Sequence, residues 1–126
     1  AMVLISHDLG VVAENCDRVA VMYAGRIVEE APSNQLFADP AHPYAQGLIG
    51  ALPPLDGPRR RLTAIPGTVP DPAKMPSGCA FAPRCTLAAE SCGLAAPTLA
   101  PIANDRSVAC IRAEASRRAL LGIAAE

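Results

Sequence analysis

The stretch that decides the fold is residues 2–10, MVLISHDLG, in which a short apolar run leads directly into a histidine. The apolar run at residues 3–5 predicts a buried strand, because strands that are covered on both faces are continuously apolar. His7 would then lie at the carboxyl end of that strand, and ligands of open α/β sheets bind beyond such ends. The stretch therefore predicts an α/β fold in which the imidazole of His7 faces a ligand.

A short helix is expected immediately after the histidine. Asp8 is its predicted N-cap, because a carboxylate accepts hydrogen bonds from the first free N–H groups of a helix. Leu9, Val12, Ala13 and Cys16 follow at the spacing i, i+3, i+4 and i+7, which places them on one apolar face. Cys16 is therefore interpreted as a small buried hydrophobic residue rather than as a ligand.

Residues 18–30, RVAVMYAGRIVEE, are expected to form a β-hairpin. Val19, Val21 and Tyr23 alternate along the first strand and so share one of its faces. The turn is predicted at residues 24–25, where alanine is followed by glycine, and the return strand begins at residues 27–28.

Two short helices are expected after the hairpin. Ser33 is the predicted N-cap of the first, which includes residues 36–37 and ends before Pro40. Pro43 suits the first position of the second helix, which is predicted to run to Pro53. The apolar face of this second helix is formed by Tyr44, Leu48, Ala51 and Leu52.

The rest of the chain is rich in proline and cysteine. Residues 53–83 carry eight of the 13 prolines, which excludes regular helix or central strand and indicates an extended, loop-rich segment. A cysteine-bearing segment follows at residues 79–110. A final amphipathic helix is predicted over residues 111–125, with Glu114 and Arg118 spaced for an i, i+4 ion pair.

The composition excludes some classes of function. The chain has 126 residues, with 11 basic and 12 acidic side chains and a net charge of −1. Because it lacks a basic stripe that could neutralise phosphates, no nucleic-acid partner is expected, and the arginines at residues 59–61 are interpreted as a solvated linker. No apolar run reaches the roughly 18 residues of a membrane span. No secretory signal is seen either, so a reducing cytoplasm is the expected compartment.

Four of the five cysteines gather in one segment. Cys79, Cys85, Cys92 and Cys110 are separated by five, six and seventeen residues. In a reducing compartment such a group suggests a metal before disulfides, and thiolates favour zinc or an iron–sulfur cluster. The spacing matches neither paired C-x₂-C zinc knuckles nor the common ferredoxin patterns. Two further interpretations stay open, namely reduced buried thiols and a zinc ion that only staples a loop with little core.

Five motifs, taken in order, resemble one protein family. Residues 5–14 (ISHDLGVVAE) are similar to the histidine-switch motif of ABC transporter ATPase domains, specifically those that energise oligopeptide and dipeptide importers. Residues 23–29 (YAGRIVE) are similar to the segment that follows this motif in that family. Three later motifs resemble the C-terminal extension of the peptide-transporter branch: residues 42–44 (HPY), 65–70 (IPGTVP) and 83–85 (PRC). The resemblance covers essentially the whole chain.

The resemblance implies an α/β fold in two parts. Residues 1–40 would be the last strands and helices of an ABC-type P-loop ATPase domain, and residues 41–126 a small, irregular, proline- and cysteine-rich extension. His7 would bond the γ-phosphate of ATP, held with Mg²⁺ in the intact subunit, and would act as a sensor and stabiliser rather than as a nucleophile. Glu14 and Asp17 are interpreted as solvated charges, since the catalytic carboxylate of the family lies upstream of this segment.

The chain lacks the other motifs of such an ATPase. It has no G-x-x-x-x-G-K-[ST] loop, no LSGGQ-like signature and no acidic strand end for magnesium. The chain alone is therefore not expected to hydrolyse ATP. The predicted strands at residues 3–5 and 19–21 would also leave unpaired edges. We expect the chain to be the C-terminal piece of a longer subunit or a truncated gene product.

The resemblance also bears on the cysteines. Some members of the family carry a [4Fe–4S] cluster on four cysteines of the extension, which implies such a cluster here, with zinc as the alternative and free thiols third. The metal would be structural or regulatory. Arg84, beside Cys85, would either donate a hydrogen bond to a cluster sulfide or face water.

The implied partners are those of an ABC importer. They are a second ATP-binding subunit, the transmembrane permease subunits and, indirectly, a periplasmic or surface peptide-binding protein. The implied location is peripheral, at the cytoplasmic face of the cell membrane. The alternative function is a stand-alone four-cysteine iron–sulfur or zinc module for electron transfer or protein interaction, and a third is a non-catalytic dimerisation piece. The sequence does not indicate which solute is transported.

Overall fold

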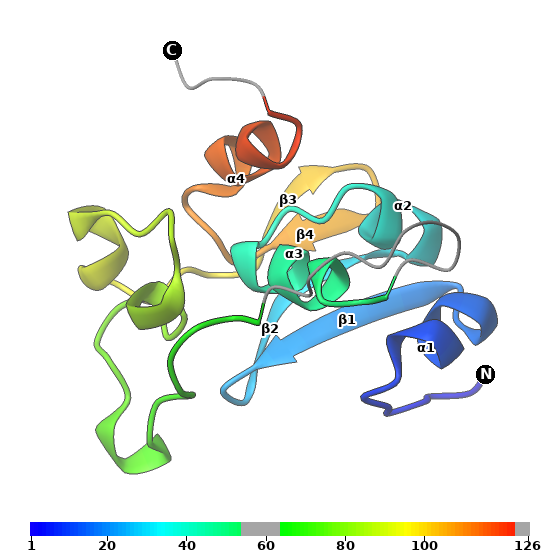
Figure 1. The fold of residues 1–126 in the computed structure, drawn as a ribbon, viewed down its shortest axis with the longest axis horizontal. Coiled ribbons are helices and arrows are strands. Elements are labelled where there is room, and N and C mark those ends of the chain that lie inside the picture. Colours follow the sequence, from blue (N-terminus) through cyan, green and yellow to red (C-terminus); the bar gives the residue numbers. More distant parts are fainter. Residues whose placement is uncertain (54–63, 123–126) are drawn as a thin grey trace.

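An antiparallel sheet organises the chain in the computed structural model, which describes residues 1–53 and 64–122. Its strand order within these residues is β1-β2-β4-β3. The strands are β1 (Arg18–Tyr23), β2 (Arg26–Pro32), β3 (Ala100–Ala103) and β4 (Arg106–Val108). Figure 1 shows the late hairpin β3–β4 lying beside the early hairpin β1–β2. The sheet therefore joins two segments from opposite ends of the sequence.

The early hairpin forms where its alternating pattern predicts it. Val19, Val21 and Tyr23 are buried, while the residues between them are exposed. The turn residues Ala24 and Gly25 have φ angles of 49° and 77°. A two-residue turn with both φ angles positive matches the right-handed twist of the flanking strands, and glycine adopts such an angle without steric cost. The predicted turn and strand alternation are confirmed.

Residues 3–5 do not form the predicted strand. The segment has no regular secondary structure, and the side chains of Val3 and Ile5 are 90% and 95% exposed. A buried strand needs a hydrogen-bonded neighbour and covering side chains, and none of the strand pairings in the described part of the chain involves this segment. The sheet is also antiparallel throughout its described pairings rather than an open parallel one.

The first two helices begin in different ways. Helix α1 (Leu9–Asn15) has the predicted N-cap, because the carboxylate of Asp8 accepts hydrogen bonds from the backbone N–H groups of Gly10 and Val11. Helix α2 (Ser33–Ala38) does not, because its N-cap is Pro32 and Ser33 is already helical. The backbone N–H of Ser33 donates to the carbonyl of Asp17 at 2.8 Å, and no side chain caps this helix.

The later helices follow the sequence more closely. Helix α3 (Pro43–Gly50) starts with proline at its first turn, as predicted, but it ends at Gly50. Helix α4 (Ala113–Leu120) carries the expected pair, in which Arg118 Nε lies 3.5 Å from Glu114 Oε1. The predicted helix was longer, at residues 111–125, and its last three residues lie outside the described part.

The segment between α3 and β3 contains three 3₁₀ turns in its described part. They are η1 (Pro72–Lys74), η2 (Ala82–Arg84) and η3 (Glu90–Gly93), joined by irregular backbone. Part of the predicted proline-rich loop, including the arginines at residues 59–61, lies outside the described residues. The two predicted parts of the chain, residues 1–40 and 41–126, both contribute strands to the one sheet.

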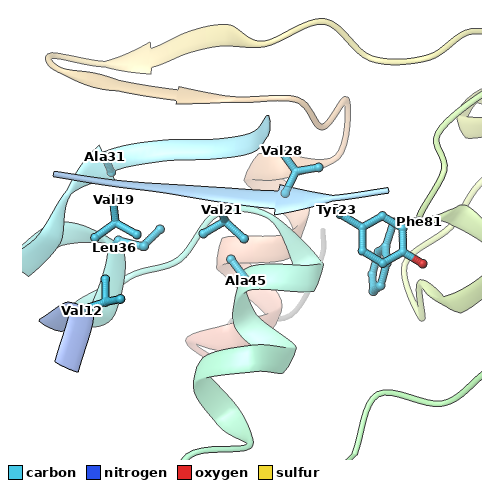
Figure 2. Close-up of a cluster of buried hydrophobic side chains, with 9 residues drawn as sticks. All are labelled: Val12, Val19, Val21, Tyr23, Val28, Ala31, Leu36, Ala45 and Phe81. Atoms are coloured by element: carbon cyan, nitrogen blue, oxygen red, sulfur yellow. The ribbon is translucent and has the colours of Figure 1, made fainter. Parts of the chain in front are cut away.

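The apolar core lies between the early hairpin and the helices. Figure 2 shows Val12 and Leu36 near one end of the strands, Ala45 of α3 near the middle, and Tyr23 with Phe81 at the other end. The rings of Tyr23 and Phe81 meet edge to face, with centroids 5.2 Å apart. Because Phe81 lies between Cys79 and Cys85 in sequence, this contact ties the cysteine segment to the hairpin.

A buried carboxylate connects β2 to the loop before α3 and to β4. Glu29 in β2 has no exposed surface. Its oxygens accept hydrogen bonds from the backbone N–H of Ala41 at 2.9 and 3.0 Å and from that of His42 at 2.7 Å. Arg106 in β4, itself 6% exposed, donates to the same carboxylate at 3.0 Å. A buried charge is tolerated when it is paired and hydrogen-bonded in this way.

The network continues to the last helix. Arg106 also donates to the backbone carbonyl and the carboxylate of Asp39. Arg117 in α4 donates to that carboxylate through Nε at 2.9 Å. Burial acts to raise the pKa of Asp39, but the hydrogen bonds and charges of Arg117 and Arg106 outweigh it and lower the pKa overall. The network therefore holds β2, β4, the loop before α3, and α4 together.

The two neighbouring glutamates of β2 allow a matched test of this network. Glu29→Ala is expected to lower the free energy of unfolding by about 3–5 kcal/mol, because Arg106 and two backbone N–H groups lose a buried acceptor. Glu30→Ala removes the surface pair with Arg18, whose side chains are 39% and 46% exposed, and should cost less than about 1 kcal/mol. Urea unfolding followed by circular dichroism at pH 7 measures both. Equal losses in the two variants would contradict the structural role assigned to Glu29.

Candidate functional site

His7 lies at the exposed N-terminal end of the chain. It precedes Asp8, the N-cap of α1, in a bend where Ser6 Oγ accepts a hydrogen bond from the Asp8 N–H at 3.0 Å. The side chain of His7 is exposed. The structure therefore leaves the imidazole accessible to a group outside the described residues.

The four cysteines at residues 79–110 lie at the other end of the sheet from this histidine. Figure 1 shows the N-terminal segment and α1 at one end of the sheet, and the segment that carries η2 and η3 at the other end. The predicted phosphate-sensing histidine and the predicted metal ligands therefore form two separate candidate sites.

Three of the four cysteines come from the segment with the 3₁₀ turns. Cys79 precedes η2, Cys85 follows it, and Cys92 is part of η3. The backbone N–H of Cys79 donates to the carbonyl of Cys92 at 2.8 Å. Cys110 lies shortly after β4, so the strand pairing between β4 and β2 determines its position.

Gly78 allows the close approach of the two turns. A Cβ atom at this position would lie 2.2 Å from the carbonyl oxygen of Cys92 and 2.7 Å from the backbone of Gly93. No side chain fits there without moving the backbone. The glycine therefore lets Cys79 lie directly beside Cys92.

The thiols of the four cysteines influence one another electrostatically. Burial, with smaller contributions from the charges of Cys79, Cys85 and Cys92, raises the pKa of Cys110 to about 11. Burial likewise raises the pKa of Cys85, with added contributions from Cys79 and Cys92. These mutual effects place all four thiols in one neighbourhood. Without a metal, Cys85 and Cys110 are neutral thiols at pH 7.

Backbone N–H groups face two of these sulfurs. The N–H of Arg112 donates to Cys110 Sγ at 3.4 Å. A hydrogen bond from the backbone of Leu87 acts to lower the pKa of Cys85. Such donors stabilise sulfur when it carries negative charge, as it does in a metal–thiolate bond.

The four sulfurs do not surround a point where one ion could bind. Within residues 1–53 and 64–122, no three His, Cys, Asp or Glu side chains converge closely enough to hold a single metal ion. The five cysteines are free thiols. The four cysteines, with N–H groups beside two of them, are therefore free thiols, and no metal-binding geometry is formed by the described residues.

The sequence suggested that Arg84 either donates a hydrogen bond to a cluster sulfide or faces water, and the structure shows a third arrangement. Its guanidinium donates to the carbonyls of Pro66 at 2.8 Å and Ile65 at 3.2 Å, and to the hydroxyl of Tyr23 at 3.4 Å. The side chain is committed to these oxygens because they lie within reach of its planar set of donors. Arg84 therefore fastens residues 65–66 to the hairpin rather than facing a cluster or water.

His42 is a functional candidate that the sequence analysis passed over. Its ring is 1% exposed, and it lines a cavity of about 310 Å³ together with Tyr23, Cys79 and Ala109. Its Nδ1 accepts the hydrogen bond that caps α3, from the Tyr44 N–H at 3.0 Å. Its Nε2 has no hydrogen-bond partner in the described structure. The HPY motif at residues 42–44 is the available signal, but by itself it indicates only a helix start and the family resemblance.

No helix of the described residues is long and apolar enough to span a membrane.

Comparison with known proteins identifies the chain's relatives. Residues 28–92 match the family described as "Oligopeptide/dipeptide transporter, C-terminal region". A peptide import ATP-binding protein of Brucella melitensis biotype 1 is 54% identical over 92 residues, which cover 73% of this chain and 28% of that protein. A peptide import ATP-binding protein of Brucella ovis is 50% identical over 117 residues, which cover 88% of this chain and 35% of that protein. The chain thus spans about a third of the length of these relatives.

The buried imidazole of His42 predicts sensitivity to acid. Burial lowers its pKa from 6.5 to about 4. The unfolded chain therefore binds more protons than the folded chain between these values, so the stability present above pH 6.5 is lost as the pH falls toward 4. The loss attributable to this residue should be about 3 kcal/mol.

Urea unfolding of the metal-free chain at pH 7 and pH 4.5 measures this loss. His42→Asn keeps a side-chain acceptor at the N-cap and should weaken the pH dependence. His7→Asn, at an exposed histidine, serves as the control and should behave as the wild type does. An unchanged pH dependence in His42→Asn would show that another group causes the acid sensitivity.

Proposed function

Because the chain belongs to the family of oligopeptide/dipeptide transporter C-terminal regions, we propose that it forms the C-terminal part of the ATP-binding subunit of an ABC peptide importer. The alignment that covers 88% of the chain at 50% identity, and only 35% of the relative, carries this proposal. In the intact subunit, residues 1–40 would complete the ATPase domain and residues 41–126 would form its extension. The subunit would pair with a second ATP-binding subunit and dock peripherally on the cytoplasmic side of the permease.

His7 would be the residue of this chain that contacts nucleotide. Phosphoryl transfer depends mainly on positioning and on stabilising charge, and an imidazole N–H can donate a hydrogen bond to a γ-phosphate oxygen. Its exposed position supports this role, because the phosphate-binding loop and the magnesium ligands must come from other residues than these. ATP and Mg²⁺ would therefore be bound jointly by this segment and by the rest of the subunit.

The four gathered cysteines would hold a [4Fe–4S] cluster in the extension. Cys79, Cys85, Cys92 and Cys110 would each supply one thiolate, and zinc is the alternative metal. The cluster would cross-link the 3₁₀ turns to the end of β4 and could carry an electron. The chain supplies one buried and three half-buried thiols, the backbone donors of Leu87 and Arg112, and the close contact at Gly78.

A second candidate function is a stand-alone four-cysteine module. One observation favours it: the cysteine segment and the hairpin β1–β2 share a core through Tyr23 and Phe81. The cysteine site therefore needs the hairpin, but it does not need the exposed residues 1–7 that carry His7.

A chimera tests the ATPase assignment. The upstream two thirds of the Brucella ovis relative, joined to this chain at the aligned boundary, should hydrolyse ATP. His7→Ala should lower its kcat by about 100-fold, because one hydrogen-bond donor to the transition state is lost. Glu14→Gln, on the exposed surface of α1, is the control and should keep the activity. A folded, nucleotide-binding chimera whose activity does not depend on His7 would contradict the proposed role.

Metal analysis tests the cysteine site. The chain purified without oxygen should contain about four irons and four sulfides and show a broad visible absorption band. Cys92→Ser should lose this iron, whereas Cys16→Ser should keep it, because Cys16 packs against the core near α1. One zinc per chain and no iron would show that the four cysteines hold zinc instead of a cluster. No metal in the wild-type chain would overturn the proposed centre.

A further inference from the structure

The cavity of about 310 Å³ lies between the turn of the early hairpin and the segment around the start of η2. Residues 23–28 line it on the hairpin side, and residues 75–81 line it on the other. Two of the lining side chains, Ile27 and Met75, are 40% and 38% exposed, so the cavity opens to solvent. A cavity of this size that solvent can reach suits a small molecule.

A buried histidine offers this cavity one polar atom. His42 lines the cavity and is 1% exposed. Its backbone N–H donates to Glu29 at 2.7 Å, and its carbonyl accepts from the Gln46 N–H at 3.0 Å. Its Nδ1 accepts the Tyr44 N–H at 3.0 Å. Nε2 is therefore the one polar atom of His42 that has no partner among the described residues.

The hydrogen bond at Nδ1 makes Nε2 a donor. A neutral imidazole has one N–H and one acceptor nitrogen. Because Nδ1 is the acceptor and burial lowers the pKa of His42 to about 4, the ring at pH 7 is neutral and carries its proton on Nε2. Leaving a buried donor unsatisfied costs free energy, so a ligand that brings an acceptor into the cavity is favoured.

The charge of the cavity lining is positive. Arg26 is the only charged side chain among the described residues that line it. Its side chain is exposed, and it forms no ion pair within residues 1–53 and 64–122, so its guanidinium is available to an anion. Most other lining residues are apolar, among them Ile27, Val28, Met75, Phe81 and Pro97. A buried donor, a cation and apolar walls together suit a carboxylate that has an apolar body.

We propose that this cavity binds a small carboxylate with an aliphatic body, whose oxygen accepts the Nε2–H of His42 and whose charge is balanced by Arg26. The proposal goes beyond the ATPase and metal-centre assignments, and it uses neither a metal nor the thiol of Cys79, which also lines the cavity. Two sources share this chemistry: a free branched-chain fatty acid and the C-terminal residue of a short peptide. Because the lining comes from both the hairpin and the cysteine-bearing segment, binding would stabilise their contact.

Titrations followed by nuclear magnetic resonance at pH 7 test the proposal with two probes. They are 4-methylpentanoate, for a free acid, and N-acetyl-leucine, for a peptide end. The complete chain, purified without oxygen, should bind at least one of them saturably with a Kd of about 0.1–1 mM, as expected for ligands of this size. Binding of only one probe would assign the source. The uncharged 4-methylpentanamide should bind about tenfold more weakly than the acid. Binding of neither probe would refute the proposal.

Matched arginine variants test the assigned residues. Arg26→Gln should raise the Kd about tenfold, because the ligand loses its countercharge. Arg18→Gln removes an exposed arginine of the neighbouring strand that does not line the cavity, and should leave the Kd unchanged. His42→Asn keeps an acceptor at the N-cap but lacks the Nε2 donor, and should also raise the Kd about tenfold. Affinities of Arg26→Gln and His42→Asn equal to that of the wild type would contradict the proposal.

A further measurement does not depend on any variant folding. In the wild-type chain saturated with probe, the Nε2 proton of His42 should shift downfield and exchange more slowly with water, because it then donates to a carboxylate. A saturated complex in which this proton is unchanged would overturn the inference. A chain that binds the probe but contains no metal would refute the proposed metal centre and leave this carboxylate site standing.

Discussion

The carboxylate of Glu29 is the constraint on which the rest of the structure depends. It has no exposed surface, so its charge must be balanced entirely by the protein. Two of its donors are backbone N–H groups of the loop before α3, and the third is Arg106, 77 positions away in sequence. Satisfying one side chain therefore requires that the early hairpin, the loop, the late hairpin and, through Asp39, the last helix assemble together.

This constraint reaches the cysteine site through two neighbouring residues. Ala41 belongs to the apolar cluster of side chains against which Cys110 packs. His42 contacts the ring of Phe81 and lines a cavity together with Cys79. Cys110 consequently joins the other three thiols only when β4 has paired with β2. His7, in contrast, depends on little more than the local cap of α1 and lies exposed at the other end of the sheet. The two candidate sites thus differ in what they require: one needs the complete fold of this chain, and the other needs residues from elsewhere in the subunit.

Sequence reasoning succeeded where the interactions span a few residues. The alternation in β1, its positive-φ turn, the Asp8 cap, the proline at the start of α3 and the Glu114–Arg118 pair were all predictable. Each is determined by neighbours within about one turn of helix or one hairpin. The motifs also indicated the family, which the comparisons confirm. The same local reasoning failed at Ser33 and Arg84, because a distant carbonyl in each case supplied the partner.

The sequence by itself determined the hairpin, the helix starts, the four cysteines and the family to which the chain belongs. Only the tertiary structure decided that residues 3–5 form no strand, that β3 and β4 complete the sheet, and that Glu29 meets Arg106. It also decided that His42 is buried, that its Nε2 has no partner among the described residues, and that its ring lines a cavity with Cys79. The physical reason is that pairing of strands and burial of charge depend on which distant partners are present. Local patterns of propensity and hydrophobicity carry no information about those partners.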